Sequence, residues 1–182
     1  TVSGGELVYS DLDSRSRRQV APPQIVCLNT KDGKELWRKD TEKLSRFKYN
    51  SGPSIVISGE RVLAGGSFGL RALNKKTGET EWAKAGPKGH GGSAAPLKNV
   101  DMFVIDGVVW RGNGTIIEGF DLNTGKSVRE IDSASVNSRG HHGRCYGGKA
   151  TSKYILGQQR GVEFLSLESE SMHTSNNWTR GP

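Results

Sequence analysis

The stretch LRALNKKTGETEW, residues 70–82, predicts two short β-strands joined by a polar turn. An apolar run leads into the turn, Gly78 lies at its end, and a second run follows as far as Trp82. A short connection that ends on glycine is typical of a β-hairpin, because the last turn position often needs a positive φ angle. The stretch is therefore best explained as one hairpin of a larger sheet.

The same unit occurs four times along the chain. It reads IVCLNTKDGKELW at residues 25–37, IEGFDLNTGKSVR at 117–129 and, in a divergent form, VEFLSLESESMHT at 162–174. Successive copies are 45, 47 and 45 residues apart, measured between Leu28, Leu73, Phe120 and Leu165. The turn position is held by Gly33, Gly78, Gly125 and finally Glu170. A strand-rich period of this length is typical of β-propeller blades, each a four-stranded antiparallel sheet.

Each unit would supply the third and fourth strands of its blade, so two more strands are expected just before it. In the second copy they are residues 54–58 and 61–65, joined by a two-residue turn at Gly59. The first copy leaves only residues 1–2 for an innermost strand, and the fourth has a poor last strand. We predict an all-β chain of about four blades, with approximate bounds 1–49, 50–92, 93–138 and 139–182.

The repeat resembles that of the PQQ-type, quinoprotein-like or BamB-like β-propellers. The resemblance is clearest at CLNTKDGKELW and ALNKKTGETEW, weaker at FDLNTGKSVRE, and degenerate at LSLESESMHT. In that family the tryptophan that ends the unit docks between neighbouring blades. The resemblance therefore implies a structural docking role for Trp37 and Trp82, which the third and fourth copies lack. The turn glycines Gly33, Gly78 and Gly125 belong to the same structural set.

Closure of the ring is a separate expectation. Propellers usually close by sharing the strands of one blade between the two termini, and no suitable pair is visible in this sequence. Members of the resembled family commonly have eight blades. We therefore expect four blades to be half of a larger ring, completed by further sequence or by another chain.

Composition narrows the possible partners. The formal net charge of the 182 residues is +7, but the basic residues are scattered, apart from Arg15, Arg17 and Arg18 in a serine-rich insertion. Such a cluster is more typical of a solvated loop than of a phosphate-binding surface, so no nucleic-acid partner is expected. No window approaches the roughly 18 apolar residues of a membrane span. The two cysteines, Cys27 and Cys145, are expected to form no disulfide in a larger ring, although a closed four-blade ring would make their blades neighbours.

The most unusual polar stretch is HHGRCYGGKAT, residues 141–151, between the third and fourth blades. Linkers into innermost strands face the central channel of a propeller. The candidate ligand-binding residues are therefore His141, His142, Arg144, Cys145 and Lys149. They would form a cationic channel lining for an anionic ligand or a partner segment. The alternative is that they only join neighbouring blades by hydrogen bonds.

Two chemical functions bear on this stretch, metal binding and nucleophilic catalysis. A metal site is not predicted, because on a strand His141 and Cys145 would lie about 13 Å apart and adjacent histidines would point to opposite faces. A cysteine nucleophile at Cys145 is possible in principle, since Arg144 would favour its thiolate. A lone cysteine is more often buried and inert. No catalytic residue is therefore assigned.

The resemblance offers two functions. The first is a non-catalytic binding or scaffold module of an exported bacterial protein, periplasmic or secreted, that binds a protein partner or a small anionic ligand through its loops and channel, with no cofactor. The second is part of a PQQ-dependent dehydrogenase that oxidises alcohols or sugars with bound PQQ and calcium. The sequence has neither the adjacent cysteine pair of those enzymes nor the haem attachment motif C-x-x-C-H. We therefore favour the binding module over the enzyme.

Overall fold

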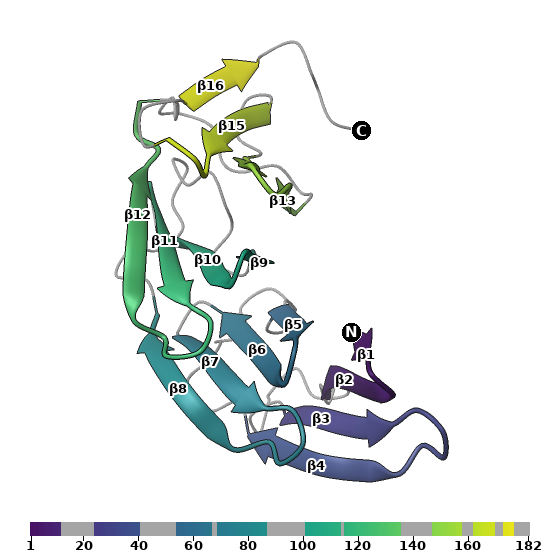
Figure 1. The fold of residues 1–182 in the computed structure, drawn as a ribbon. Coiled ribbons are helices and arrows are strands. Elements are labelled where there is room, and N and C mark those ends of the chain that lie inside the picture. Colours follow the sequence, from purple (N-terminus) through teal and green to yellow (C-terminus); the bar gives the residue numbers. More distant parts are fainter. Residues whose placement is uncertain are drawn as a thin grey trace, which may run out of the picture. The chain divides into compact units, whose positions relative to one another are not determined.

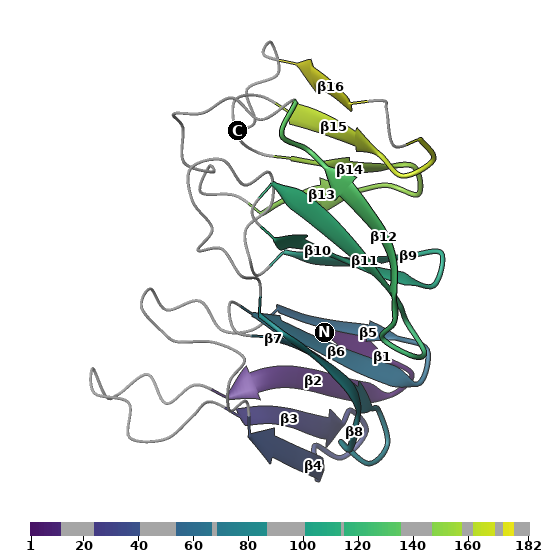
Figure 2. The ribbon, with the colours of Figure 1, turned by 90° about the vertical axis from the view of Figure 1, so that its left-hand side faces the viewer.

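The computed structural model of the chain describes residues 1–11, 24–40, 54–66, 69–86, 101–113, 115–135, 147–157, 162–169 and 173–176. In these ranges the structure consists of strands and turns, without a helix. The strands form four antiparallel sheets of four strands each. In every sheet the strands are neighbours in chain order, so each sheet is a simple meander (Figures 1 and 2). The prediction of an all-β chain built from four-stranded blades is confirmed.

The four sheets follow the four sequence repeats. The first contains β1 (Val2–Ser3), β2 (Glu6–Asp11), β3 (Gln24–Asn29) and β4 (Glu35–Asp40). The second contains β5 (Ser54–Ser58), β6 (Arg61–Gly66), β7 (Gly69–Asn74) and β8 (Thr80–Ala85). The third contains β9 (Met102–Ile105), β10 (Val108–Asn113), β11 (Ile116–Asp121) and β12 (Ser127–Asp132). The fourth contains β13 (Lys149–Ala150), β14 (Tyr154–Leu156), β15 (Val162–Ser166) and β16 (His173–Asn176).

The chain divides into two compact units, residues 1–86 and 87–182, with two sheets in each. In the N-terminal unit, the core between the first and second sheets is formed by Val8, Ile25, Cys27, Trp37, Val62, Ala64 and Leu73. In the C-terminal unit, the core between the third and fourth sheets is formed by Trp110, Ile117, Ile131, Ile155, Leu165 and Leu167. Each sheet thus buries an apolar face against the next sheet in its unit, as expected for short strands that cannot fold alone.

The turn between the third and fourth strands has the same structure in the first three sheets. Gly33, Gly78 and Gly125 have φ angles of 71°, 71° and 67°. Their N–H groups donate to the carbonyl oxygens of Asn29, Asn74 and Asp121. The side-chain oxygens of those same residues accept backbone N–H groups two residues further on, an arrangement that favours a turn over continued pairing. The repeated Asn/Asp and Gly positions therefore fix where each hairpin reverses.

A β-bulge follows this turn at the same position in all three sheets. The pairing register shifts between Cys27 and Leu28, between Ala72 and Leu73, and between Gly119 and Phe120. A bulge turns the side chains of its strand relative to regular pairing. Beyond the shift, the residues paired across the hairpin are Cys27 with Trp37, Ala72 with Trp82 and Gly119 with Arg129. The bulge therefore selects which side chain of the last strand faces the next sheet.

Cys27 lies in the core of the N-terminal unit as a free, fully buried cysteine. Burial raises the pKa of its thiol, the carboxylate of Glu6 raises that pKa further, and Lys75 lowers it by less. Because the thiolate is the nucleophile, the folded protein should be resistant to thiol reagents at this position. Cys145 lies outside the described residues.

We expect Cys27 in the folded Cys145→Ser variant to react with a chromogenic disulfide reagent at about pH 8 much more slowly than a free thiol does. Because the pKa of the Cys27 thiol is raised, the thiol stays protonated at a pH where an ordinary cysteine would ionise. Burial also blocks access of the reagent to the sulfur. The same variant in urea serves as the control and should react fully. Rapid stoichiometric reaction of the folded variant would contradict the position of Cys27 in the core.

Among the residues that the structure describes, no helix has the length and apolar character needed to cross a membrane.

Candidate binding site

The junction between the first and second sheets is closed by Trp37 of β4. Its ring is buried, and its Nε1 donates a hydrogen bond of 2.7 Å to the carbonyl oxygen of Lys75. The ring lies against the turn of the second sheet so closely that a Cβ atom on Gly78 would approach three of its atoms to 2.7–3.0 Å. Real Cβ atoms are not found that close. Gly78 therefore serves two needs, a positive φ angle and room for the indole.

Lys75, whose carbonyl receives the Trp37 indole, is itself buried although its position in a turn suggested an exposed side chain. Its Nζ lies 3.5 Å from Glu6 Oε2 in the first sheet and 3.7 Å from Glu60 Oε1 in the second. Its backbone N–H donates to the carbonyl of Glu60. The lysine thus connects the two sheets. The repeat gave one signal for this burial, because Leu122 and Leu167 occupy the equivalent position in later copies.

The junction between the third and fourth sheets is built differently. Arg129 holds the position of Trp37 in the repeat, beyond the same bulge. Its Nη1 donates to the carbonyl oxygen of Leu167, the residue equivalent to Lys75. Both bonds join residues 38 positions apart. The arginine therefore keeps the hydrogen bond of the docking tryptophan without its ring.

A tryptophan is present in the third sheet, but on a different strand. Trp110 of β10 is paired with Gly119 of β11, and a Cβ on Gly119 would lie 3.0 Å from both Trp110 and Val108. In the second sheet the residues at the matching positions are Leu63 and Ala72. The third sheet thus has its large ring on the second strand, against Gly119 of the third, and an arginine on its outermost strand.

Beside Arg129, which stands where the first sheet has Trp37, there is a cleft between the third and fourth sheets. Its volume is about 350 Å³, and it is lined by Ile105, Asp106, Val108, Trp110, Val128, Arg129, Ser152, Leu167 and Glu168. Apolar side chains form most of the wall, while Asp106, Arg129 and Glu168 supply charge. Concave sites with an apolar wall and a few polar groups are typical of ligand-binding sites. The cleft is therefore the candidate binding site in the described residues.

Residues 1–171 of the sequence match the family described as outer membrane protein assembly factor BamB. The chain belongs to this family. The structure of BamB from Moraxella catarrhalis is similar to it, with a TM-score of 0.58 and 15% identity over 91% of this chain and 44% of that one. A europium-containing methanol dehydrogenase is also similar, with a TM-score of 0.51 and 13% identity over 71% of this chain and 23% of that one. No curated protein matches the sequence.

These comparisons confirm the resemblance to the PQQ-type, BamB-like propellers. At such identities the similar structures show the fold and nothing further. This BamB-family chain spans less than half the length of the Moraxella catarrhalis BamB chain.

The channel residues expected from the sequence are largely untested by the structure. His141, His142, Arg144 and Cys145 lie outside the described residues. Lys149 is described and is exposed at the start of β13, where it pairs with Leu156. Just before it, the N–H of Gly148 donates to Asp101 Oδ2, which fixes the entry into β13. The cationic channel lining stays a prediction for this BamB-family chain.

A quinoprotein activity would require a site for calcium beside PQQ. Calcium prefers several converging oxygen ligands, commonly from carboxylates. In the described parts of this BamB-family chain, no three His, Cys, Asp or Glu side chains gather in such a way.

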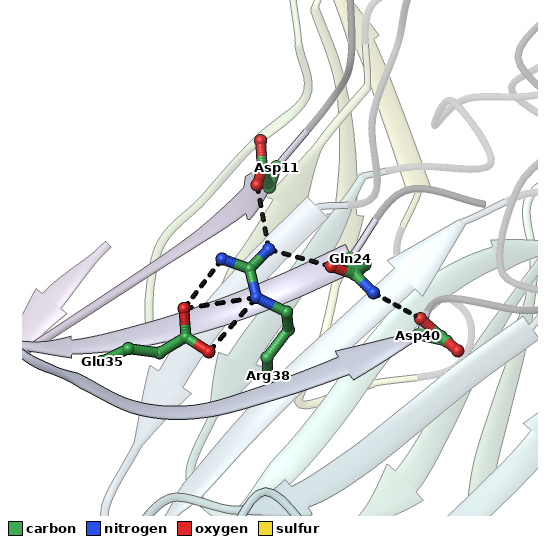
Figure 3. Close-up of polar contacts among 5 residues, drawn as sticks. All are labelled: Asp11, Gln24, Glu35, Arg38 and Asp40. Carbon is green, nitrogen blue, oxygen red and sulfur yellow. Dashed lines mark hydrogen bonds and ion pairs between the residues drawn. The ribbon is translucent and has the colours of Figure 1, made fainter. Parts of the chain in front are cut away.

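A second polar cluster surrounds Arg38 on the outermost strand of the first sheet (Figure 3). Arg38 binds Glu35 through Nε and Nη2, and Asp11 and Gln24 through Nη1, while Gln24 also donates to Asp40. The groups are exposed and satisfy one another. The cluster is therefore best explained as charge that protects an outer strand from pairing with other chains, and not as a ligand site.

The Arg38 cluster makes a testable prediction for one carboxylate. The hydrogen bonds from Arg38 hold the pKa of Glu35 below its ordinary value. Replacing Arg38 with methionine should raise the pKa of Glu35 toward that value, as followed by carboxyl-carbon NMR during an acid titration. The Arg38–Glu35 contact stabilises the folded state when the pH is above the ordinary pKa of a glutamate. This stabilisation is lost as the pH falls through the lowered pKa of Glu35. Lys39→Met is the matched control, and an equal change in both variants would contradict the direct contact.

Proposed function

We propose that this chain is part of a non-catalytic scaffold of the bacterial cell envelope, which binds a protein partner during assembly of outer membrane proteins. The observation that carries the proposal is the family match over residues 1–171. Its location would accordingly be the periplasm or the periplasmic face of the outer membrane. Charged residues are depleted from the buried core of protein interfaces. The net charge of +7 and the polar hairpin turns therefore suit an exposed contact with a partner more than a position buried inside a large complex.

A binding role is supported by the difference between the two sheet junctions: the first is filled by packed side chains, and the second contains an open cleft. At the first junction the buried Lys75 and the partly buried Glu6 connect the two sheets, and Trp37 packs against Gly78 of the second sheet. These residues are explained by stability alone. Within the described residues, the cleft beside Arg129 has side chains arranged around open space, which is a requirement for binding.

The proposal is tested in the native bacterium with the full-length protein. Deleting the gene should lower the amount of folded outer membrane β-barrel proteins, measured by heat-modifiable mobility in gels, and the intact gene should restore it. Unchanged barrel assembly in the deletion strain would contradict the proposal. In parallel, the purified full-length protein is titrated with PQQ and calcium. Saturable binding together with dye reduction by alcohols would replace the scaffold with the quinoprotein enzyme.

A further inference from the structure

The cleft beside Arg129 lies where an indole ring lies at the first junction. Trp37 and Arg129 hold the same repeat position. Trp37 donates to the carbonyl of Lys75 and Arg129 to the carbonyl of Leu167, and these two acceptors are also equivalent in the repeat. The acceptor carbonyl and the bulge are therefore retained, while the ring that would lie over them is not. The open volume of about 350 Å³ is found at this position.

We infer that the cleft binds one tryptophan side chain of a partner protein. The inference deepens the proposed function, and it rests on that function only for the partner being a protein. Ligand pockets range from about 300 to 1,000 Å³. The cleft is at the small end of this range, which suits a single ring.

The walls of the cleft suit an aromatic ring in particular. Val108, Trp110 and Leu167 line the cleft with apolar groups, and an aromatic residue in the wall suits an aromatic occupant, because aromatic rings favour contact with one another. The guanidinium of Arg129 is held in place by its bond to Leu167. A cation fixed beside an open apolar wall attracts the face of an aromatic ring, and tryptophan is the strongest such partner.

The charge at the rim indicates what lies next to the tryptophan in the partner. Asp106 is an exposed carboxylate on the two-residue turn between β9 and β10, with a φ angle of 49°. Glu168, the other carboxylate of the cleft, lies 3.2 Å from the ammonium of Lys153. The negative charge of Asp106 favours an occupant with a basic residue beside its ring. The expected ligand is therefore a tryptophan flanked by lysine or arginine.

The test uses the full chain and two blocked peptides, acetyl-Lys-Trp-Lys-amide and acetyl-Glu-Trp-Glu-amide. Binding is measured by calorimetry and by the NMR shift of the Trp110 indole N–H. We expect saturable 1:1 binding, several times tighter for the lysine peptide. Arg129→Trp places the ring within the chain and should weaken binding at least tenfold. Glu130→Trp adds the same ring to an exposed neighbour and should leave binding unchanged. Asp106→Asn, which keeps a residue suited to positive φ, should remove most of the preference between the peptides.

Several outcomes would overturn the inference. No saturable binding of either peptide would do so, as would binding that Arg129→Trp and Glu130→Trp affect equally. Trp178 of this chain provides a further check. If the peptides bind only after Trp178→Ala, the chain itself supplies the occupant and the partner is not needed. Peptide binding is measured on purified protein, and barrel assembly is measured in the bacterium. Either result can be negative while the other is positive, so tryptophan binding and the assembly role are tested separately.

Discussion

Replacing Trp37 with alanine should lower the free energy of unfolding of the N-terminal unit by about 3–5 kcal/mol, the usual cost of removing a large buried aromatic side chain. The ring is 8% exposed and belongs to the core between the first two sheets. Its loss also leaves the carbonyl of Lys75 without the 2.7 Å bond from the indole. Urea denaturation followed by far-UV circular dichroism measures the change.

The matched control for this variant is Leu36→Ala. Leu36 precedes Trp37 on the same strand but is 47% exposed. Substitutions at exposed positions usually change stability by no more than about 0.5 kcal/mol. If the two variants lose similar stability, Trp37 does not dock between the sheets.

Replacing Gly78 with alanine should cost more than the same change at Gly33, although the two turns have the same φ angle of 71°. A non-glycine residue in this region costs about 1–2 kcal/mol, and this cost applies to both positions. At Gly33 the added Cβ meets nothing within 4 Å, whereas at Gly78 it meets the Trp37 ring. Overpacking of this kind adds about 1–3 kcal/mol.

The origin of that difference is tested by repeating both glycine substitutions in the Trp37→Ala background. Removing the ring removes the clash, so the extra cost at Gly78 should disappear while the cost at Gly33 stays the same. Contacting residues are expected to show such non-additivity, and separated ones are not. An extra cost at Gly78 that persists without Trp37 would place the strain in the backbone and not in the docking contact.

The sequence predicted the sheets well because their signals are local and repeat four times. The turn at Gly78, the apolar runs beside it and their recurrence at Gly33 and Gly125 are enough to place the hairpins. The docking role of Trp37 came from the family resemblance, and the structure shows the ring against Gly78.

The junctions were harder to predict because their contacts join residues 38 positions apart. Lys75 is one of the scattered basic residues of the sequence, yet its side chain is buried beside Glu6 and Glu60. Arg129 counted only as a missing tryptophan. Its role as the hydrogen-bond donor in place of tryptophan became clear only from the bulge, the bond to the Leu167 carbonyl and the cleft. The bond and the cleft depend on the packing of two sheets, which leaves no periodic pattern in the sequence.

The site chosen from the sequence, at residues 141–149, rested on a concentration of reactive side chains in one linker. Of its members the structure describes Lys149, which is an exposed strand residue. The cleft beside Arg129 was not anticipated, because its walls come from three strands of the third sheet, β9, β10 and β12, and from turns of both sheets. An arginine at the tryptophan position of the weaker third copy was the available signal.

The most direct test of this account is an NMR measurement of the contact between Trp37 and Gly78 in the intact protein. If the repeats stack through the docking ring, the Hα protons of Gly78 lie over the indole. They should be moved strongly upfield by its ring current and should show nuclear Overhauser effects to it, while the protons of Gly33 should show neither. Ordinary shifts at Gly78 without contacts to Trp37 would contradict the junction on which both the fold and the cleft comparison depend.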